Sequence, residues 1–256
     1  MRVVLGVLLA FFALTVNAAS IWGSWYGIDQ GQAKGEVVFT FFPDGTYFMN
    51  DHGIHALDPT GQPGIERGTY TWDEATGAFS AVTLVNTDGE WGLSDGFPSK
   101  VTITGGTLTA SDSTVLTRLA DPGSALVGGW YLADQPDAGD LALLSFLPNG
   151  HYLLGSDPPA TGDLEYGTYT WNQSTAAFGF TVVDTTDSTK GFSGTPVSAI
   201  VVSDSQIQLT TADGPVIFAA TPTPEPQTYA LILAGLAGVA AVARRSTRLS
   251  KSAAQS

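Results

Sequence analysis

Apolar and polar residues alternate along the middle of the chain with the two-residue period of β-strands. Residues 37–42 form an apolar run, Pro43-Asp44-Gly45 follows as a turn, and residues 46–48 return from it. This pattern predicts a β-hairpin, because proline fixes one backbone angle and glycine supplies a positive one. In residues 69–72 threonine alternates with tyrosine and tryptophan, as in a strand with one face in a core. Similar patterns predict strands at residues 78–85, 101–104, 107–109 and 115–117.

Three of the patterns occur twice, in the same order and at nearly fixed spacing. Two pairs are separated by 105 residues and the third by 99, so six residues are missing from the second copy. They are missing from the loop that contains His52 and His55 in the first copy. Such ordered landmarks indicate an internal duplication of a unit of about 100 residues. The matched pairs are 23–26 with 128–131, 42–47 with 147–152, and 68–72 with 167–171.

The duplication and the strand patterns together predict the fold class. We expect an all-β protein with two tandem copies, residues 19–122 and 123–220. Each copy is predicted to be an antiparallel meander of seven or eight short strands, closed into a small barrel or a sandwich. No amphipathic helix of useful length is found between the two chain ends.

The opening of each copy bears on the choice between barrel and sandwich. Residues 23–26 and 128–131 share the pattern Gly-x-Trp-Tyr, which resembles the first strand of lipocalin-like barrels, where the tryptophan closes one end. The resemblance covers only these few residues. It favours a barrel over a sandwich and does not assign ligand transport.

The N-terminus has the parts of a secretory signal peptide. Arg2 precedes an apolar run over residues 3–16, and small residues follow up to Ala18. This arrangement predicts a signal peptide over residues 1–18, cleaved after Ala18. A buried helix or a membrane anchor is the alternative, but the run is short for a bilayer core about 30 Å thick.

The C-terminus consists of three segments in a fixed order. Residues 221–226 are a proline-rich spacer, residues 227–243 are uncharged and apolar, and residues 244–256 carry basic residues and no acidic ones. The prolines hold the spacer extended, because they cannot join a helix or a sheet ladder. The apolar segment is just long enough to span a membrane as a helix. The basic tail would stay in the cytoplasm, with the N-terminus outside.

These C-terminal features carry a resemblance to a known sorting signal. Pro224-Glu225-Pro226, the short apolar segment and Arg244-Arg245 resemble the PEP-CTERM signal of exported proteins in Gram-negative bacteria that make extracellular polysaccharide. The resemblance implies export by the Sec translocon and recognition of the motif by an exosortase, a transpeptidase-like membrane enzyme. It also implies removal of the tail and sorting to the cell surface or matrix. An ordinary tail anchor is the alternative.

Charge narrows the range of partners. The segment 19–226 contains all 24 acidic residues and only five of the 10 Lys and Arg residues, so its net charge is −19. Such a field repels nucleic acid and anionic lipid, because phosphate binding requires Lys and Arg. The chain has no cysteine, which excludes thiol catalysis, iron–sulfur clusters and cysteine zinc sites.

Two groups of residues are candidates for binding a metal ion. Asp51, His52 and His55 have a His-x-x-His spacing, but a transition metal needs three or four ligands in a set geometry, and a solvated loop is the simpler interpretation. Asp88, Glu90 and Asp95 lie in oxygen-rich turns that could hold Ca²⁺, yet they lack the full acidic loop of an EF-hand. Turn chemistry is the preferred explanation, because Asp, Asn and Gly form turns in any case, and we expect no metal and no cofactor.

No complete catalytic motif is found. A Gly-x-Ser-x-Gly spacing occurs at residues 92–96, but no helix is expected after it, so it is not the strand-to-helix elbow of a serine nucleophile. The sequence also lacks a phosphate-binding loop and a dinucleotide fingerprint. We therefore expect a protein that is not an enzyme, and a hydrolase of matrix polysaccharide is the least favoured alternative.

The tryptophans suggest where a ligand would bind. The matched pairs Trp25/Trp130 and Trp72/Trp171 are expected in the cores, whereas Trp22 and Trp91 have no aromatic counterpart in the other copy. Unmatched indole rings could stack on sugars or simply cap the barrel. We expect a structural or binding component associated with exopolysaccharide, and the alternative is a barrel that binds a small ligand or a glycan in its mouth. An apolar cavity open at one end would favour binding over a structural role.

Overall fold

The computed structural model describes residues 20–28, 35–53, 62–89, 92–94, 96, 98–132, 141–157 and 162–222. The predicted signal peptide, the sorting motif, the membrane segment and the basic tail lie outside the described residues. Both β-sheets belong to one compact unit, Ala19–Pro224.

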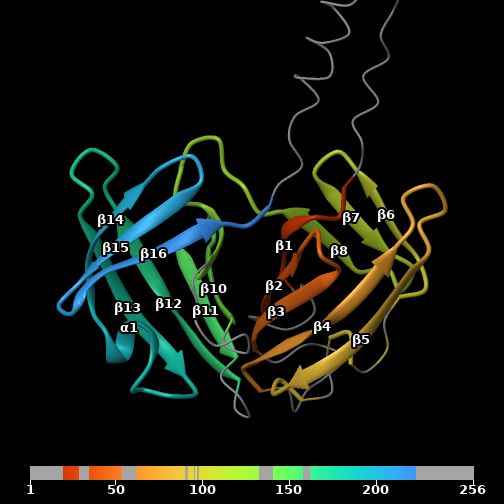
Figure 1. The fold of residues 1–256 in the computed structure, drawn as a ribbon, viewed down its shortest axis with the longest axis horizontal. Coiled ribbons are helices and arrows are strands. Elements are labelled where there is room, and N and C mark those ends of the chain that lie inside the picture. The colour runs from red at the N-terminus through yellow and green to blue at the C-terminus, as the bar shows by residue number, and fades with distance from the viewer. Residues whose placement is uncertain are drawn as a thin grey trace, which may run out of the picture. The chain divides into compact units, whose positions relative to one another are not determined.

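The described chain forms two eight-stranded antiparallel sheets, one from each copy of the repeat (Figure 1). The strand order of the first sheet is β5-β4-β3-β2-β1-β8-β7-β6, and the second repeats it as β13-β12-β11-β10-β9-β16-β15-β14. The first sheet contains β1 (Gly23–Ile28), β2 (Glu36–Phe41), β3 (Thr46–His52), β4 (Gly64–Trp72), β5 (Phe79–Asn86), β6 (Val101–Thr104), β7 (Thr107–Ala110) and β8 (Val115–Arg118). The second contains β9 (Gly128–Leu132), β10 (Leu141–Phe146), β11 (His151–Asp157), β12 (Asp163–Trp171), β13 (Phe178–Thr185), β14 (Val197–Val202), β15 (Gln206–Thr211) and β16 (Gly214–Ala220).

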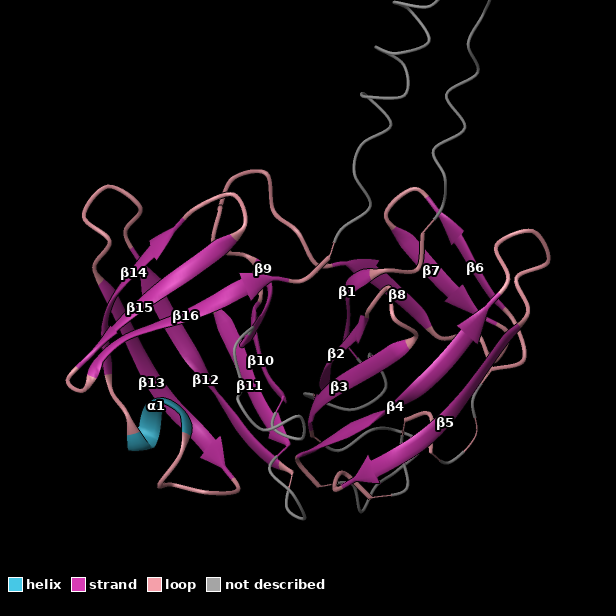
Figure 2. Ribbon diagram, viewed as in Figure 1, coloured by secondary structure: helices cyan, strands magenta, loops and turns pink. Residues whose placement is uncertain are grey.

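Strands dominate the fold, and the one helix in the described residues is the short α1 (Gly191–Gly194) (Figure 2). The all-β prediction is therefore confirmed. Each sheet curls so that one isolated bridge links its two edges, Ala78↔Lys100 in the first sheet and Ala177↔Ala199 in the second. The first sheet stays open as a half-barrel, whereas β13 lies beside β14 and nearly closes the second. We call these sheets the first and the second barrel.

The duplication extends to individual hydrogen bonds. The indole Nε1 of Trp25 donates to the carbonyl of Ile21 at 2.7 Å, and that of Trp130 donates to the carbonyl of Leu126 at 2.9 Å. Both tryptophans are buried, as predicted. A β-bulge also recurs, in β4 just before Gly68 and at the corresponding place in β12. The repeat found in the sequence is therefore a repeat of structure.

The predicted Pro-Asp-Gly hairpin is also confirmed. Gly45 has a φ of +86° and donates to the carbonyl of Phe42 at 3.2 Å, while Asp44 accepts from the backbone N–H of Thr46 at 2.9 Å. Gly150 makes the same turn in the second copy, with a φ of +85°. An L-residue with a side chain rarely adopts this backbone conformation, so both turns depend on glycine.

The two tryptophans at the ends of β4 and β12 are less buried than expected. Trp72 and Trp171 are half-buried and pack at the edge of each core. Each indole Nε1 still donates to a backbone carbonyl, of Val101 at 3.0 Å and of Ile200 at 2.9 Å. These bonds connect β4 to the start of β6 and β12 to β14, so the tryptophans tie the curled sheet edges together.

Strand β2 is buried on both faces because it lies between two cores. Phe39 and Phe41 belong to the core inside the first barrel, whereas Val38 belongs to a core between the barrels. Neighbouring side chains of a strand point to opposite faces, so an unbroken apolar run needs a cover on each side. Strand β10 is arranged in the same way, with Phe146 inside the second barrel and Leu143 in the core between the barrels.

A shared core joins the two barrels. Phe48 and Ile65 of the first copy pack there with Leu153 and Leu164 of the second, and all four are almost fully buried. The backbones approach closely, since a Cβ atom added at Gly155 would lie 1.8 Å from Oδ1 of Asn50. The complete buried set is Val38, Phe42, Phe48, Ile65, Leu119, Val127, Leu143, Leu147, Leu153, Leu164 and Tyr166.

Within the described part of the chain, no helix has the length and apolarity needed to cross a bilayer.

Candidate functional site

The first barrel contains a partly open cavity of about 180 Å³ with mostly apolar walls. Strand β2 contributes Phe39 and Phe41, and β5 contributes Phe79. The opposite wall comes from Leu108 on β7 and Leu116 on β8. All five side chains are buried, so the apolar wall of the cavity belongs to the core of the first barrel, while the cavity itself opens to solvent.

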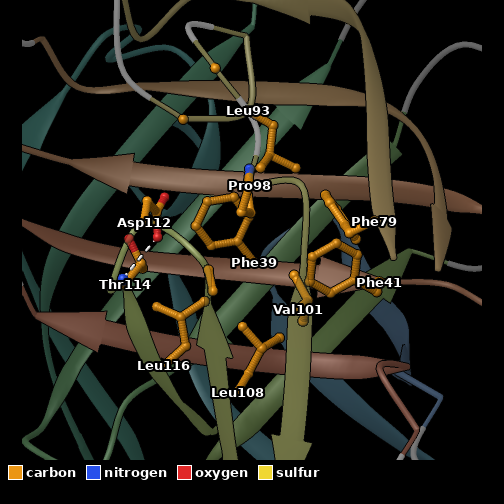
Figure 3. A pocket seen from close by; sticks show the side chains of 13 residues that line it. Phe39, Phe41, Phe79, Leu93, Pro98, Val101, Leu108, Asp112, Thr114 and Leu116 are labelled. Carbon is orange, nitrogen blue, oxygen red and sulfur yellow. Dashed lines mark hydrogen bonds between the residues drawn. The ribbon is translucent and has the colours of Figure 1, made fainter. Parts of the chain in front are cut away.

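Figure 3 shows the cavity lining from close by. Phe41 and Phe79 lie edge to face with ring centroids 6.1 Å apart, and Leu93 and Pro98 stand near Phe39. The polar side of the cavity is formed by Asp112 and Thr114, where the Thr114 backbone N–H donates to the Asp112 carboxylate at 2.8 Å. No cationic side chain is among the lining residues described.

A buried carboxylate fixes the loop that covers this cavity. Glu66 on β4 accepts hydrogen bonds from the hydroxyls of Tyr47 and Thr83, and from the backbone N–H of Ser94 at 2.9 Å. A Cβ atom added at Gly92 would lie 2.6 Å from Glu66 Oε2, and Gly92 has a φ of +95°. The loop therefore needs glycine for its backbone conformation and for its approach to the carboxylate.

The second barrel repeats this arrangement with Glu165. Its carboxylate accepts from the Tyr152 hydroxyl at 2.8 Å and from the backbone N–H groups of Phe192 and Ser193 at 3.0 and 2.8 Å. Gly191 takes the place of Gly92, with a φ of +60°. Burial, followed by the interaction with the carboxylate, raises the pKa of Tyr152 well above its usual range, as it does for Tyr47 in the first barrel. Both tyrosines therefore stay protonated and act as hydrogen-bond donors.

Sequence reasoning missed these carboxylates, although a signal was present. Glu66 and Glu165 are 99 residues apart, which is the spacing of the neighbouring repeat motif, and each directly follows an apolar residue of the core, Ile65 or Leu164. The pattern Gly-x-Ser of residues 92–94 recurs at residues 191–193 with the same spacing. A glutamate and a Gly-x-Ser loop that recur together indicate that the two are in contact, because a buried charge requires hydrogen bonds.

A second polar cluster lies where the barrels meet. The ring of His52 stacks on Tyr166 with centroids 3.6 Å apart, and Nε2 of His52 is 3.7 Å from Oδ2 of Asp184. His151 Nδ1 lies 2.9 Å from both carboxylate oxygens of Glu36 and 2.7 Å from the Tyr166 hydroxyl. Since a carboxylate only accepts, His151 presents a protonated nitrogen to Glu36.

The interpretation of His52 as part of a solvated loop was therefore wrong. His52 is the last residue of β3, its side chain is only 13% exposed, and it faces Tyr166 of the other copy. The residues missing from the second copy placed His52 in a loop, but the side chain packs against the second barrel. His55 lies outside the described residues.

We expect His52 to make the protein less stable in mild acid. Burial lowers the pKa of His52 below its usual value near 6.5 and outweighs the opposing effect of Asp184. The unfolded chain then takes up a proton as the pH falls below about 6.5, whereas the folded chain resists it, so stability is present above that pH and is lost below it. The melting temperature of wild type should fall more steeply between pH 7 and 5 than that of His52→Gln. Parallel curves would contradict this prediction, because the carboxylates contribute equally to both proteins.

Of the two candidate sugar-stacking tryptophans, the structure describes Trp22. Trp22 is 41% exposed and its carbonyl accepts from the Arg118 guanidinium at 2.7 Å. The same guanidinium lies 4.0 Å from the ring centroid of Trp25, a cation–π contact at the start of the first barrel. Trp91 lies outside the described residues.

The candidate calcium ligands are only partly described. Asp88 is buried beside β4, and its backbone N–H donates to Oδ1 of Asn86 at 3.0 Å, which is the turn chemistry expected as the alternative. Glu90 and Asp95 lie outside the described residues. Among the residues that are described, no group of three or more His, Asp or Glu side chains is placed to hold a metal ion.

Comparison of this chain with known protein families, characterised proteins and solved structures finds no match, so the cavities and the sequence motifs carry the functional argument.

Proposed function

We propose that this is an exported, surface-sorted protein whose first barrel binds a compact apolar molecule. The observation that carries the binding role is the cavity of about 180 Å³ lined by Phe39, Phe41, Phe79, Leu108 and Leu116. A structural role alone would favour a barrel filled by its own side chains, because unfilled apolar space forfeits packing contacts.

The size and lining of the cavity define the class of ligand. An engineered apolar cavity of about 150 Å³ stays dry and takes up benzene, so about 180 Å³ suits a molecule of similar size. The rings of Phe41 and Phe79 offer edge and face contacts to an aromatic ligand. A sugar would leave most of its hydroxyls unpaired against these walls, which disfavours a glycan here.

The destination of the protein rests on the two chain ends. The signal-peptide pattern of residues 1–18 and the resemblance of Pro224-Glu225-Pro226 with Arg244-Arg245 to the PEP-CTERM signal support export by the Sec translocon and processing by an exosortase. A net charge of −19 on the segment 19–226 suits a protein displayed in a hydrated polysaccharide matrix.

Binding of fluorobenzene to the full-length protein tests the proposed role of the first barrel. We expect wild type to bind it with a Kd on the order of 0.1–1 mM, followed by ¹⁹F NMR. Ala110→Phe places a ring inside the cavity and should weaken binding at least tenfold. The full-length protein includes the expected membrane segment and is kept in detergent, which can itself take up fluorobenzene. This background is the same for wild type and variants, because all are compared under the same conditions.

A matched variant distinguishes this cavity from the one in the second barrel. Ala142→Phe makes the same change at a residue that lines the second cavity, and fluorobenzene binding should be unchanged. Equal binding by Ala110→Phe and wild type would show that the first cavity is not the site.

A further inference from the structure

The second barrel has its own cavity of about 220 Å³, which differs from the first by a group of charges on its solvent side. Leu209 and Phe218 form part of its buried apolar wall. Lys190 Nζ hydrogen-bonds to the Asp163 carboxylate and lies 3.9 Å from Oδ2 of Asp187. The three side chains are 42%, 14% and 30% exposed in that order, so they border the cavity where it meets solvent.

Comparison of the copies shows that this group of charges is particular to the second barrel. With the 99-residue spacing of this region, Asp187 corresponds to Asp88, but Asp163 corresponds to Gly64 and Lys190 to Trp91. The carboxylate that fixes the covering loop is the same in both copies, as Glu66 and Glu165. The copies thus share a scaffold and differ at the entrance, which indicates different ligands.

We propose that the second barrel is a separate site for a small amphiphile with a hydroxyl head and an apolar tail. The tail packs against Leu209, Val216 and Phe218, and the hydroxyl lies between Lys190 and Asp187. The Lys190 ammonium has three donor hydrogens, of which Asp163 takes one. Asp187 holds Thr189 through Oδ1, while its Oδ2 faces Lys190. A hydroxyl both accepts and donates, so it matches the two groups at once.

Charge at the entrance selects against other heads. Two carboxylates and one ammonium give the group a net charge of −1, so a carboxylate head that approaches Lys190 is repelled by Asp163 and Asp187. An ammonium head has to displace Lys190 from the two carboxylates. Lys190 is tethered to the chain, so it loses less conformational freedom in holding them than a free ligand does. A neutral hydroxyl meets neither obstacle.

Calorimetric titration of the full-length protein at pH 7 with 1-hexanol and with hexanoate tests the proposal. We expect 1-hexanol to bind at least tenfold more tightly than hexanoate. Ala142→Phe should abolish 1-hexanol binding, whereas Ala110→Phe, the matched change in the first barrel, should leave it unchanged.

A variant that removes charge while keeping volume tests the role of the entrance itself. Asp163→Asn combined with Lys190→Met avoids a buried unpaired carboxylate, and it should weaken 1-hexanol binding about tenfold through the lost charged hydrogen bond. It should also reduce the preference for 1-hexanol over hexanoate. This variant carries the test if Ala142→Phe lowers the melting temperature.

Three results overturn the proposal: equal affinity for the two ligands, undiminished 1-hexanol binding in a folded Ala142→Phe protein, or an unchanged affinity in the Asp163→Asn/Lys190→Met variant. The outcome is separable from that for the first barrel, because Ala110→Phe and Ala142→Phe change the two cavities one at a time.

Discussion

Phe48→Ala is expected to lower the melting temperature of the whole two-barrel unit by roughly 10 °C. Phe48 is fully buried in the core between the barrels, and removing a buried phenyl ring costs about 3–5 kcal/mol. For a protein of this size each kcal/mol corresponds to about 2–4 °C. Because this core contains residues of both copies, the two barrels should still unfold in one calorimetric transition.

The control for this change is Leu84→Ala on β5. Leu84 is 63% exposed, so its truncation should change the free energy of unfolding by no more than about 0.5 kcal/mol. Two separate transitions in Phe48→Ala, with only one of them shifted, would mean that the copies fold independently and that the shared core contributes little.

The strands and the duplication could be predicted because their signals are local. The Pro-Asp-Gly turn at residues 43–45 and the alternation at residues 69–72 each specify a conformation within a few residues. The repeat required only that such local patterns recur in order. Even so, the sequence left barrel and sandwich open, because curling depends on contacts between strands far apart, such as the bond from Trp72 to Val101.

The packing of one copy on the other could not be predicted, although residues 37–42 gave a hint. An unbroken apolar run means that both faces of β2 are covered, but it does not say by what. The polar contacts across the boundary were equally inaccessible. The ion pair of Arg67 with Asp157 and the bond from Asn50 to the Leu143 carbonyl join residues about 90 positions apart.

The cavities depend on volumes that the sequence does not encode locally. Leu93 and Phe192 occupy matching positions in the loops held by Glu66 and Glu165, yet both barrels keep open space. Whether a barrel is filled depends on how all inward side chains combine. The candidate binding residues named from sequence were instead unmatched tryptophans, of which Trp22 is found at the surface.

The folded unit ends close to the sorting motif. The backbone N–H of Thr221 donates to the Gly129 carbonyl at 2.9 Å, and its hydroxyl lies 3.2 Å from that of Ser24, so Thr221 is fixed between the two barrels. Pro224 follows only three residues later in the sequence. A tag placed just before Thr221 would disturb these contacts, whereas the exposed turn at Ala212-Asp213 between β15 and β16 accepts an insertion.

Replacing Pro224, Glu225 and Pro226 by alanine is expected to leave export intact but trap the uncut protein in the cytoplasmic membrane. On the proposed sorting, an exosortase recognises this motif, the apolar segment 227–243 would set its depth in the membrane, and the basic tail would stop translocation. Fractionation and blotting for an epitope at Ala212-Asp213 should find wild type in the surface or matrix fraction of a host with an exosortase. The triple variant should be full-length and membrane-bound in the same host.

Two comparisons separate sorting from simple anchoring. Replacing Arg244 and Arg245 should cause slippage of the tail through the membrane or loss of its orientation, because the positive charges that hold the tail in the cytoplasm are reduced. Wild type in a host without an exosortase should behave like the triple variant, since the motif is intact but nothing cuts it. If the protein reaches the matrix equally in both hosts, or with the motif erased, a plain tail anchor is the better account of residues 221–256, and the proposed destination fails while the binding roles of the two barrels stand on their own tests.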